Sequence, residues 1–144
     1  MLFGTYRSVP LSEEGLVLPP ALRDGLGEGY VITRGLDGCV SVFPLPAWEA
    51  LLERVDRGTS FLKTAARIFQ RHLFGGASVE TLGADGMVNV PDHLRRHAEL
   101  DEEVVLVGVG NRVEVWNPQR WSHEEYRMIE RSTRSSEELS ELGV

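Results

Sequence analysis

The sequence predicts an α+β protein in which two copies of one small β-rich unit form a single pseudo-symmetric β-barrel with flanking helices. The first observation behind this prediction is an internal repeat at an offset of 72 to 73 residues. The second is that each copy contains short runs of β-branched and apolar residues separated by glycine-rich turns. Four short strands per chain rarely make an independent sheet in each half, so we expect the two copies to interleave their hairpins and share one core.

The repeat rests on blocks that occur in the same order in both copies. Residues 16–23 match residues 88–95, so that Pro19 and Arg23 recur as Pro91 and Arg95 at an offset of 72. Residues 40–43 likewise match residues 113–116 at an offset of 73, and the apolar, β-branched runs 30–33 and 104–107 lie between these anchors. Three blocks in one order indicate an internal duplication.

Each copy is expected to contain the same elements in the same order. The first copy should have a turn at 13–15, a strand at 16–18, a helix at 20–24, a hairpin turn at 35–38 and a helix at 46–55. The second copy should have a turn at 83–86, a strand at 87–90, a helix at 92–96, a hairpin turn at 108–111 and a helix at 118–131. Glycine and short polar residues permit the turns, and proline near a helix start sacrifices no hydrogen bond. Trp48 and Trp121 fall in the first turns of the two closing helices.

Between the copies, residues 60–73 are expected to form a helix capped by Thr59 or Ser60 and ended by Gly75 and Gly76. Its apolar stripe consists of Phe61, Ala65, Ile68, Phe69 and His72. A basic stripe on another face consists of Lys63, Arg67 and Arg71 at i, i+4 and i+8. This basic stripe is either a solvated helix face or a contact with another subunit or with phosphate.

These elements define the predicted domain organisation. The segments are a first repeat at 1–48, connecting helices at 49–76, a second repeat at 77–121, and a C-terminal helix with a flexible acidic tail at 122–144. Serine and glutamate dominate residues 132–144, which have little to bury and are expected to be frayed or disordered.

The net charge of −7, from 15 basic and 22 acidic residues, argues against generic nucleic-acid binding. The charge is uneven, because residues 99–144 hold 11 acidic and 5 basic residues while residues 1–98 hold 11 and 10. Fourteen of the fifteen basic residues are arginine, whose planar fork suits phosphate or carboxylate. Genomic base composition explains the same arginine bias equally well.

Candidate catalytic and metal-binding residues are few. Cys39 has no histidine near it in sequence and precedes an apolar strand, so we expect a buried thiol rather than a nucleophile. His93 and His97 are spaced i, i+4 but lack a third ligand. We therefore expect no enzyme activity, no metal and no cofactor. The single cysteine, the missing signal pattern and the lack of an apolar run of about 18 residues predict a cytoplasmic protein without membrane contact.

The assembled blocks resemble the MraZ family of bacterial transcription regulators, which govern the division and cell-wall gene cluster. The resemblance runs from Phe3 to about Trp121, and its most specific stretches are residues 33–44, 67–77 and 112–116. It implies two AbrB-like swapped-hairpin β units per chain. It also implies a ring-shaped homo-oligomer at the nucleoid that binds repeated elements of double-stranded promoter DNA through loops of the β units.

The family's Asp-x-x-x-Arg turn motif is degenerate in both copies. With Pro19 and Pro91 aligned, the motif positions hold Leu11 and Gly15 in the first copy, and Gly83 and Met87 in the second. The remaining candidates for DNA binding near the turns are Arg7, Gly15, Arg23, Gly86, Arg95 and Arg96.

The acidic pair Glu13 and Glu14 motivates a competing hypothesis, because it places negative charge where the family carries positive charge. In that hypothesis the chain is a divergent MraZ paralogue that has lost its DNA contacts. It would act through protein assembly, with an intact MraZ relative as one partner, or as an antitoxin-like module.

Overall fold

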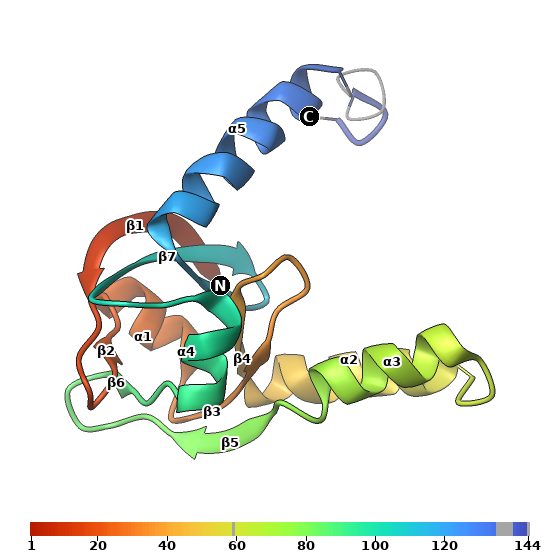
Figure 1. Ribbon diagram of the computed structural model, residues 1–144, viewed down its shortest axis with the longest axis horizontal. Helices are drawn as coiled ribbons and strands as arrows, with labels where there is room; N and C mark the ends of the chain where they lie inside the picture. The colour runs from red at the N-terminus through yellow and green to blue at the C-terminus, as the bar shows by residue number, and fades with distance from the viewer. Residues whose placement is uncertain (59, 135–139, 144) are drawn as a thin grey trace.

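The computed structural model describes residues 1–58, 60–134 and 140–143 (Figure 1). The elements of the first repeat are β1 (Leu2–Pro10), β2 (Leu16–Val17), α1 (Pro20–Leu26), β3 (Gly29–Arg34) and β4 (Val40–Pro44). Those of the second repeat are β5 (Ser78–Thr81), β6 (Met87–Val88), α4 (Asp92–Ala98), β7 (Glu103–Gly110) and β8 (Val113–Trp116). The remaining helices are α2 (Leu45–Gly58), α3 (Thr64–Leu73) and α5 (Pro118–Arg134).

The two repeats exchange strands, as the sequence predicted. One six-stranded antiparallel sheet has the order β1-β7-β8-β4-β3-β5, and β2 pairs with β6 in a separate two-stranded sheet. The first strand of each repeat thus pairs with the third strand of the other, β1 with β7 and β5 with β3. The order is symmetric about the β8–β4 pair, which gives the protein a pseudo-twofold axis between its repeats.

The expectation of a closed barrel is only partly met. Strands β1 and β5 lie at opposite edges of the six-stranded sheet and do not pair with each other, so the sheet is open. Helices α1 and α4 pack against it, and the β2–β6 ladder forms a separate sheet rather than extending the six-stranded one. Leu22 of α1 and Leu94 of α4, equivalent by the repeat, are fully buried in one core with Ile32 and Leu106. Complete burial of each such side chain contributes about 1.5–3 kcal/mol to stability.

Helices α2 and α3 form a two-helix arm that projects from the sheets, and α5 projects in another direction (Figure 1). Helix α3 begins at Thr64 rather than at Ser60. The Ser60 hydroxyl instead accepts a hydrogen bond from the Leu62 N–H at 3.3 Å within the preceding turn, so the expected cap is wrong for Ser60. The alternative cap, Thr59, lies outside the described residues.

Helix α5 continues to Arg134, so the beginning of the segment expected to be frayed, from Ser132, is helical. The rest of that expectation falls largely on residues 135–139 and 144, which lie outside the described part of the chain. None of the described helices has the length and apolar character needed to cross a membrane.

Candidate nucleic-acid interface

The two turns expected to meet DNA lie at opposite ends of one short ladder, because the strands that follow them pair antiparallel. Leu16 of β2 lies opposite Val88 of β6, so the turns at 12–15 and 83–86 flank one antiparallel ladder. Gly15 has φ +127°, and a Cβ added there would lie 1.9 Å from the Val88 carbonyl oxygen. Glycine at this position is therefore required by the close approach of the opposite repeat.

Arg23 and Arg95, the equivalent arginines of α1 and α4, each bind the turn of the other repeat. The Nη2 atom of Arg23 donates to the Asp85 carbonyl at 2.8 Å, and that of Arg95 donates to the Glu13 carbonyl at 3.2 Å. The Nε atom of Arg95 also donates to the Val90 carbonyl at 2.8 Å. Both arginines are half-buried, and each gives one of its N–H donors to a turn carbonyl of the other repeat. The Nε atom of Arg23 is buried, and no hydrogen-bond partner for it occurs among the described residues.

Gly86 lies directly against Arg23. A Cβ added at Gly86 would be 2.4 Å from the Nε of Arg23, and Gly86 itself has φ +81°. This glycine leaves room for the guanidinium to reach the Asp85 carbonyl. Gly15 and Gly86, both proposed as DNA-binding residues, are buried and shape the turns.

The exposed side chains of the turns are acidic. Glu13 and Glu14 are exposed in the first turn and Asp85 in the second. A hydrogen bond from its own backbone N–H, followed by one from the Ser12 hydroxyl at 3.0 Å, lowers the pKa of the Glu14 carboxyl. The turn tips therefore present negative charge at neutral pH, which opposes a phosphate backbone.

Two other predicted residues lie apart from these contacts. Arg7 in β1 forms an ion pair with Glu125 of α5, with 2.6 Å between Nη2 and Oε2, and so links the edge strand to the projecting helix. Arg96 of α4 is exposed and, within the described part of the chain, makes no side-chain hydrogen bond or ion pair.

In the basic stripe of α3, one residue forms hydrogen bonds within the chain, and the other two make none with the described residues. Arg67 is engaged, because its guanidinium donates to the carbonyls of Phe61 and Leu62 at 2.9 and 2.8 Å and so holds the turn before the helix. Lys63 and Arg71 are exposed, and the described residues provide their side chains with no hydrogen bond or ion pair.

The C-terminal end of α3 is fixed to β3 by Thr33 and Arg34, for which no role was expected from the sequence. The Thr33 hydroxyl donates to the Leu73 carbonyl, and Nη1 of Arg34 donates to the His72 carbonyl at 3.1 Å. The rings of His72 and His97 lie 5.4 Å apart, which brings α3 against α4. The His93 Nε2 lies 3.0 Å from the carbonyl of Gly76, just beyond α3.

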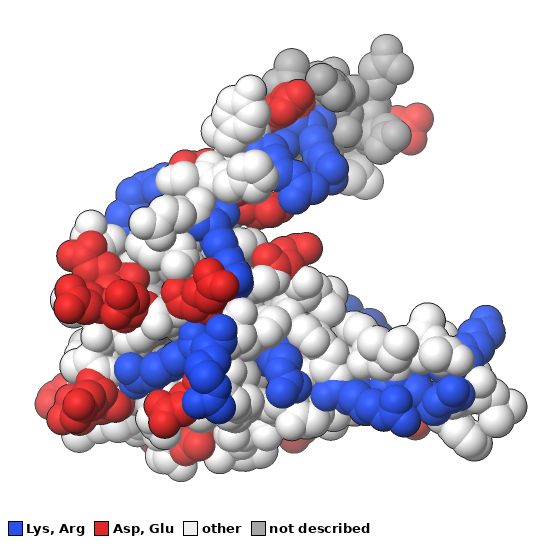
Figure 2. Space-filling view, viewed as in Figure 1, with Lys and Arg blue, Asp and Glu red and all other residues white. Residues whose placement is uncertain are grey.

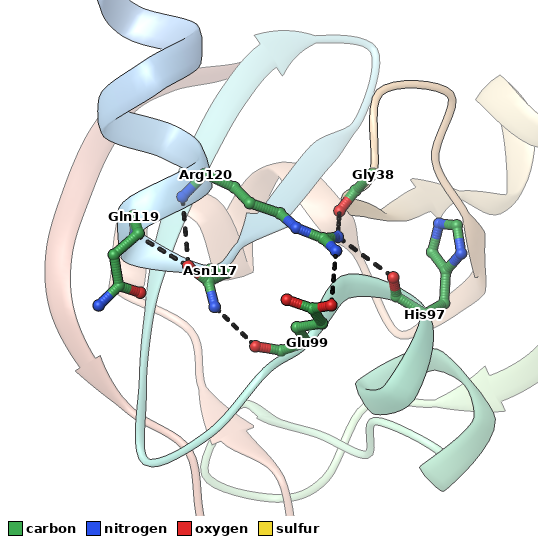
Figure 3. A network of polar contacts seen from close by, with 6 residues as sticks. All are labelled: Gly38, His97, Glu99, Asn117, Gln119 and Arg120. Carbon is green, nitrogen blue, oxygen red and sulfur yellow. Dashed lines mark hydrogen bonds and ion pairs between the residues drawn. The ribbon is translucent and has the colours of Figure 1, made fainter.

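A second network joins α5 to both repeats (Figure 3). Arg120 donates to the Gly38 carbonyl at 2.9 Å and to the His97 carbonyl at 3.2 Å, and it pairs with Glu99 at 3.2 Å. The Asn117 side-chain oxygen accepts from the Arg120 N–H at 3.2 Å and so caps α5. Asparagine followed by proline at a helix start is a capping signal that could have indicated this residue from the sequence.

His97 occupies a positively charged environment. Burial first, and then the charges of His72, Arg34 and Arg120, lower the pKa of the His97 imidazole. Its Nε2 atom is buried, and no hydrogen-bond partner for it occurs among the described residues.

Cys39 is fully buried, as expected, and burial is the main cause that raises the pKa of its thiol to about 12. His93 and His97, the pair considered for a metal, have separate neighbours in Gly76 and His72. Within the described residues, no group of three histidine, cysteine or acidic side chains could hold a metal ion.

Comparison with known proteins accounts for this duplicated architecture. The profile of a family described as "MraZ protein, putative antitoxin-like" matches the chain twice, over residues 5–72 and 73–141. The chain belongs to the MraZ family. The predicted repeat and the predicted family are thereby confirmed, while the domain boundaries at residues 48, 76 and 121 stay a prediction.

Relatives of similar length carry the same name. "Transcriptional regulator MraZ" of Heliobacterium modesticaldum is 40% identical over 98% of this chain and 95% of its own length. The protein of that name from Natranaerobius thermophilus is 34% identical over the full length of both chains. A third, from Deinococcus radiodurans, is 38% identical over 84% of each chain.

Proposed function

We propose that this MraZ-family protein is a DNA-binding transcriptional regulator that recognises repeated promoter elements upstream of the division and cell-wall gene cluster. The observation that carries the proposal is the pair of family repeats, folded as one strand-swapped framework that holds two equivalent turns at the two ends of one short antiparallel ladder. The relatives' printed name, transcriptional regulator, supports the same role. Such a protein would act in the cytoplasm, at the nucleoid.

The test is a gel mobility-shift titration with double-stranded DNA from upstream of the protein's own gene. Specific protein–DNA complexes form with dissociation constants of about 10 nM or lower at physiological salt. A shift that persists against excess unrelated DNA is the expected result. Absence of a shift at about 1 µM protein in low salt would contradict the proposal, because even non-specific binding begins near that concentration.

Ring-shaped homo-oligomerisation is part of the proposal, and exposed apolar side chains support it. Ile68 of α3 is 58% exposed and Phe61 is 69% exposed, although both belong to the predicted apolar stripe. Tyr126 and Ile129 of α5 are also exposed. Helices with such faces gain stability when another surface covers them.

Light scattering during size-exclusion chromatography tests the assembly. The wild-type protein should elute as an oligomer, and Ile68→Glu should shift it towards the monomer. Val109→Glu is the matched control, because it places the same charge at an exposed apolar position on β7 rather than on the arm. A monomeric wild-type protein would contradict the proposed ring.

The alternative function is that of a divergent paralogue that assembles with an intact MraZ relative without touching DNA. The acidic turn residues Glu13 and Glu14 favour it, together with the absence of arginine at the motif positions Gly15 and Met87. Co-expression with an intact relative and affinity capture test it. Mixed oligomers without any DNA shift would support the alternative, and separate homo-oligomers would oppose it.

A further inference from the structure

Basic side chains gather over α4 and form a row along α3 on one face of the molecule (Figure 2). The residues of these helices that carry such charge are Arg95 and Arg96 in α4, with Arg67 and Arg71 in α3 and Lys63 at its N-cap. The guanidinium groups of Arg95 and Arg67 are occupied by backbone carbonyls. Lys63, Arg71 and Arg96 remain available, and we name them together the α3–α4 basic face.

The two helices approach each other at one histidine from each. The rings of His72 and His97 are 5.4 Å apart, and these residues directly follow Arg71 and Arg96 in the chain. From Lys63 to Arg71 the helical rise amounts to about 12 Å, since each residue adds 1.5 Å. That length corresponds to roughly three to four phosphates along one strand of a DNA duplex.

Basic groups surround His97 at this joint. After burial, the charges of His72, Arg34 and Arg120 contribute to lowering the pKa of His97, which lies between the two helices. By contrast, the turn tips expose Glu13, Glu14 and Asp85. A phosphate backbone therefore encounters favourable potential at α3 and α4 and unfavourable potential at the turns.

The exposed apolar side chain of Ile68 lies beside the basic side chains of α3. At about 100° per residue, Ile68 lies roughly 140° around the helix axis from Lys63 but only about 60° from Arg71. Ala66 and Leu73, which are buried, mark the side of α3 that faces the protein. A subunit that covered Ile68 would therefore lie next to Arg71, whereas Arg96 lies on another helix, α4.

We infer that the α3–α4 basic face binds the phosphate backbone of double-stranded DNA, in place of phosphate contacts at the tips of the two turns. The inference rests on the proposed DNA-binding function and names the surface that attracts the DNA electrostatically. Phosphate contacts fix position and supply salt-dependent affinity without reading sequence.

The experiment is fluorescence anisotropy with a labelled duplex from upstream of the gene, titrated at several salt concentrations between about 50 and 200 mM. The double variant R71A/R96A should bind at least about tenfold more weakly at the lowest salt. Its plot of log K against log salt should lose about 0.9 of slope for each phosphate contact removed. R71K/R96K keeps the charges and should restore both the affinity and the slope.

The control variant R54A/R131A removes the same charge from exposed arginines of α2 and α5, and it should change affinity less than about threefold with no change of slope. Circular dichroism verifies that each variant is folded. If the wild-type protein binds DNA and R71A/R96A has the same affinity and slope, the inference is overturned but the proposed function stands. Loss of slope in R54A/R131A to the same degree would also overturn it, because only net charge would then matter. No binding by the wild-type protein would instead remove the proposed function.

Discussion

Arg23 in the first repeat donates a hydrogen bond to the backbone carbonyl of Asp85 in the second repeat, at 2.8 Å. Arg95 makes the equivalent contact in the opposite direction, to the carbonyl of Glu13 at 3.2 Å. Arg23 and Arg95 are 72 residues apart in the sequence, and so are Glu13 and Asp85. The two contacts are therefore related by the internal repeat. The turns are therefore held from the opposite repeat, and we expect Arg23 and Arg95 to position them.

Replacing Arg23 by alanine should lower the free energy of unfolding by about 1–2 kcal/mol, because a half-buried charged hydrogen bond and its packing on Gly86 are lost. Arg95→Ala should have a similar effect. Arg96→Ala, next to Arg95 but exposed, should stay within about 0.5 kcal/mol of wild type. Urea unfolding measures all three, and equal destabilisation by Arg96→Ala would contradict the positioning role.

Gly15→Ala should destabilise the protein by several kcal/mol, because the added Cβ would lie 1.9 Å from the Val88 carbonyl oxygen of β6 at a φ of +127°. Gly86→Ala should cost less, since its Cβ would meet the movable side chain of Arg23. Gly58→Ala at the end of α2 is the control, with nothing within 4 Å of the new atom. If thermal unfolding showed Gly58→Ala to be as destabilising as Gly15→Ala, the close approach of Gly15 to the Val88 carbonyl would be contradicted.

The thiol of Cys39 should be unreactive in the native protein. Burial is the main cause that raises its pKa to about 12, and the thiolate is the reactive species. Ellman's reagent at about pH 8 should therefore titrate the cysteine only after denaturant is added. Because the folded-state pKa lies above the ordinary value of 9.0, stability should decrease as the pH rises past that value. Rapid labelling of the native thiol would contradict its burial.

Stability should also decrease on the acid side through His97. Its pKa is lowered in the folded state, so the unfolded chain binds a proton first as the pH falls below the ordinary value of 6.5. The stabilisation is complete above that pH and is lost as the pH falls through the lowered folded-state pKa. Thermal melts of His97→Gln should show a smaller loss between about pH 7 and pH 5 than the wild type. His123→Gln on α5 is the control, and a profile for His97→Gln identical to wild type would contradict the assignment.

The strand exchange could be predicted from the sequence because the repeat has a physical consequence. The second strand of each copy has only two residues, and Leu22 and Leu94 are buried in one core with residues of both repeats. The open sheet was not predictable from the same pattern. Strand length and alternation indicate which residues pair, but not that β2 and β6 would leave the main sheet to form their own ladder.

The contacts around the turns could be predicted only in part. The sequence placed Arg23 and Arg95 near the turns, but it could not show that their acceptors belong to the other repeat. Such contacts depend on the pseudo-twofold packing and not on local spacing. The exposure of Ile68 could not be predicted from the sequence either. An apolar stripe has the same residue pattern whether it packs within the chain or against another copy.

The most direct test of the account is the equilibrium affinity of the wild-type protein for its own upstream duplex, measured over a salt series with a shuffled duplex as competitor. The account predicts tight binding to the native duplex, preference over the shuffled one, and affinity that falls steeply as salt rises. Equal or undetectable binding to both duplexes at low salt would contradict the assignment of this chain as a sequence-specific regulator.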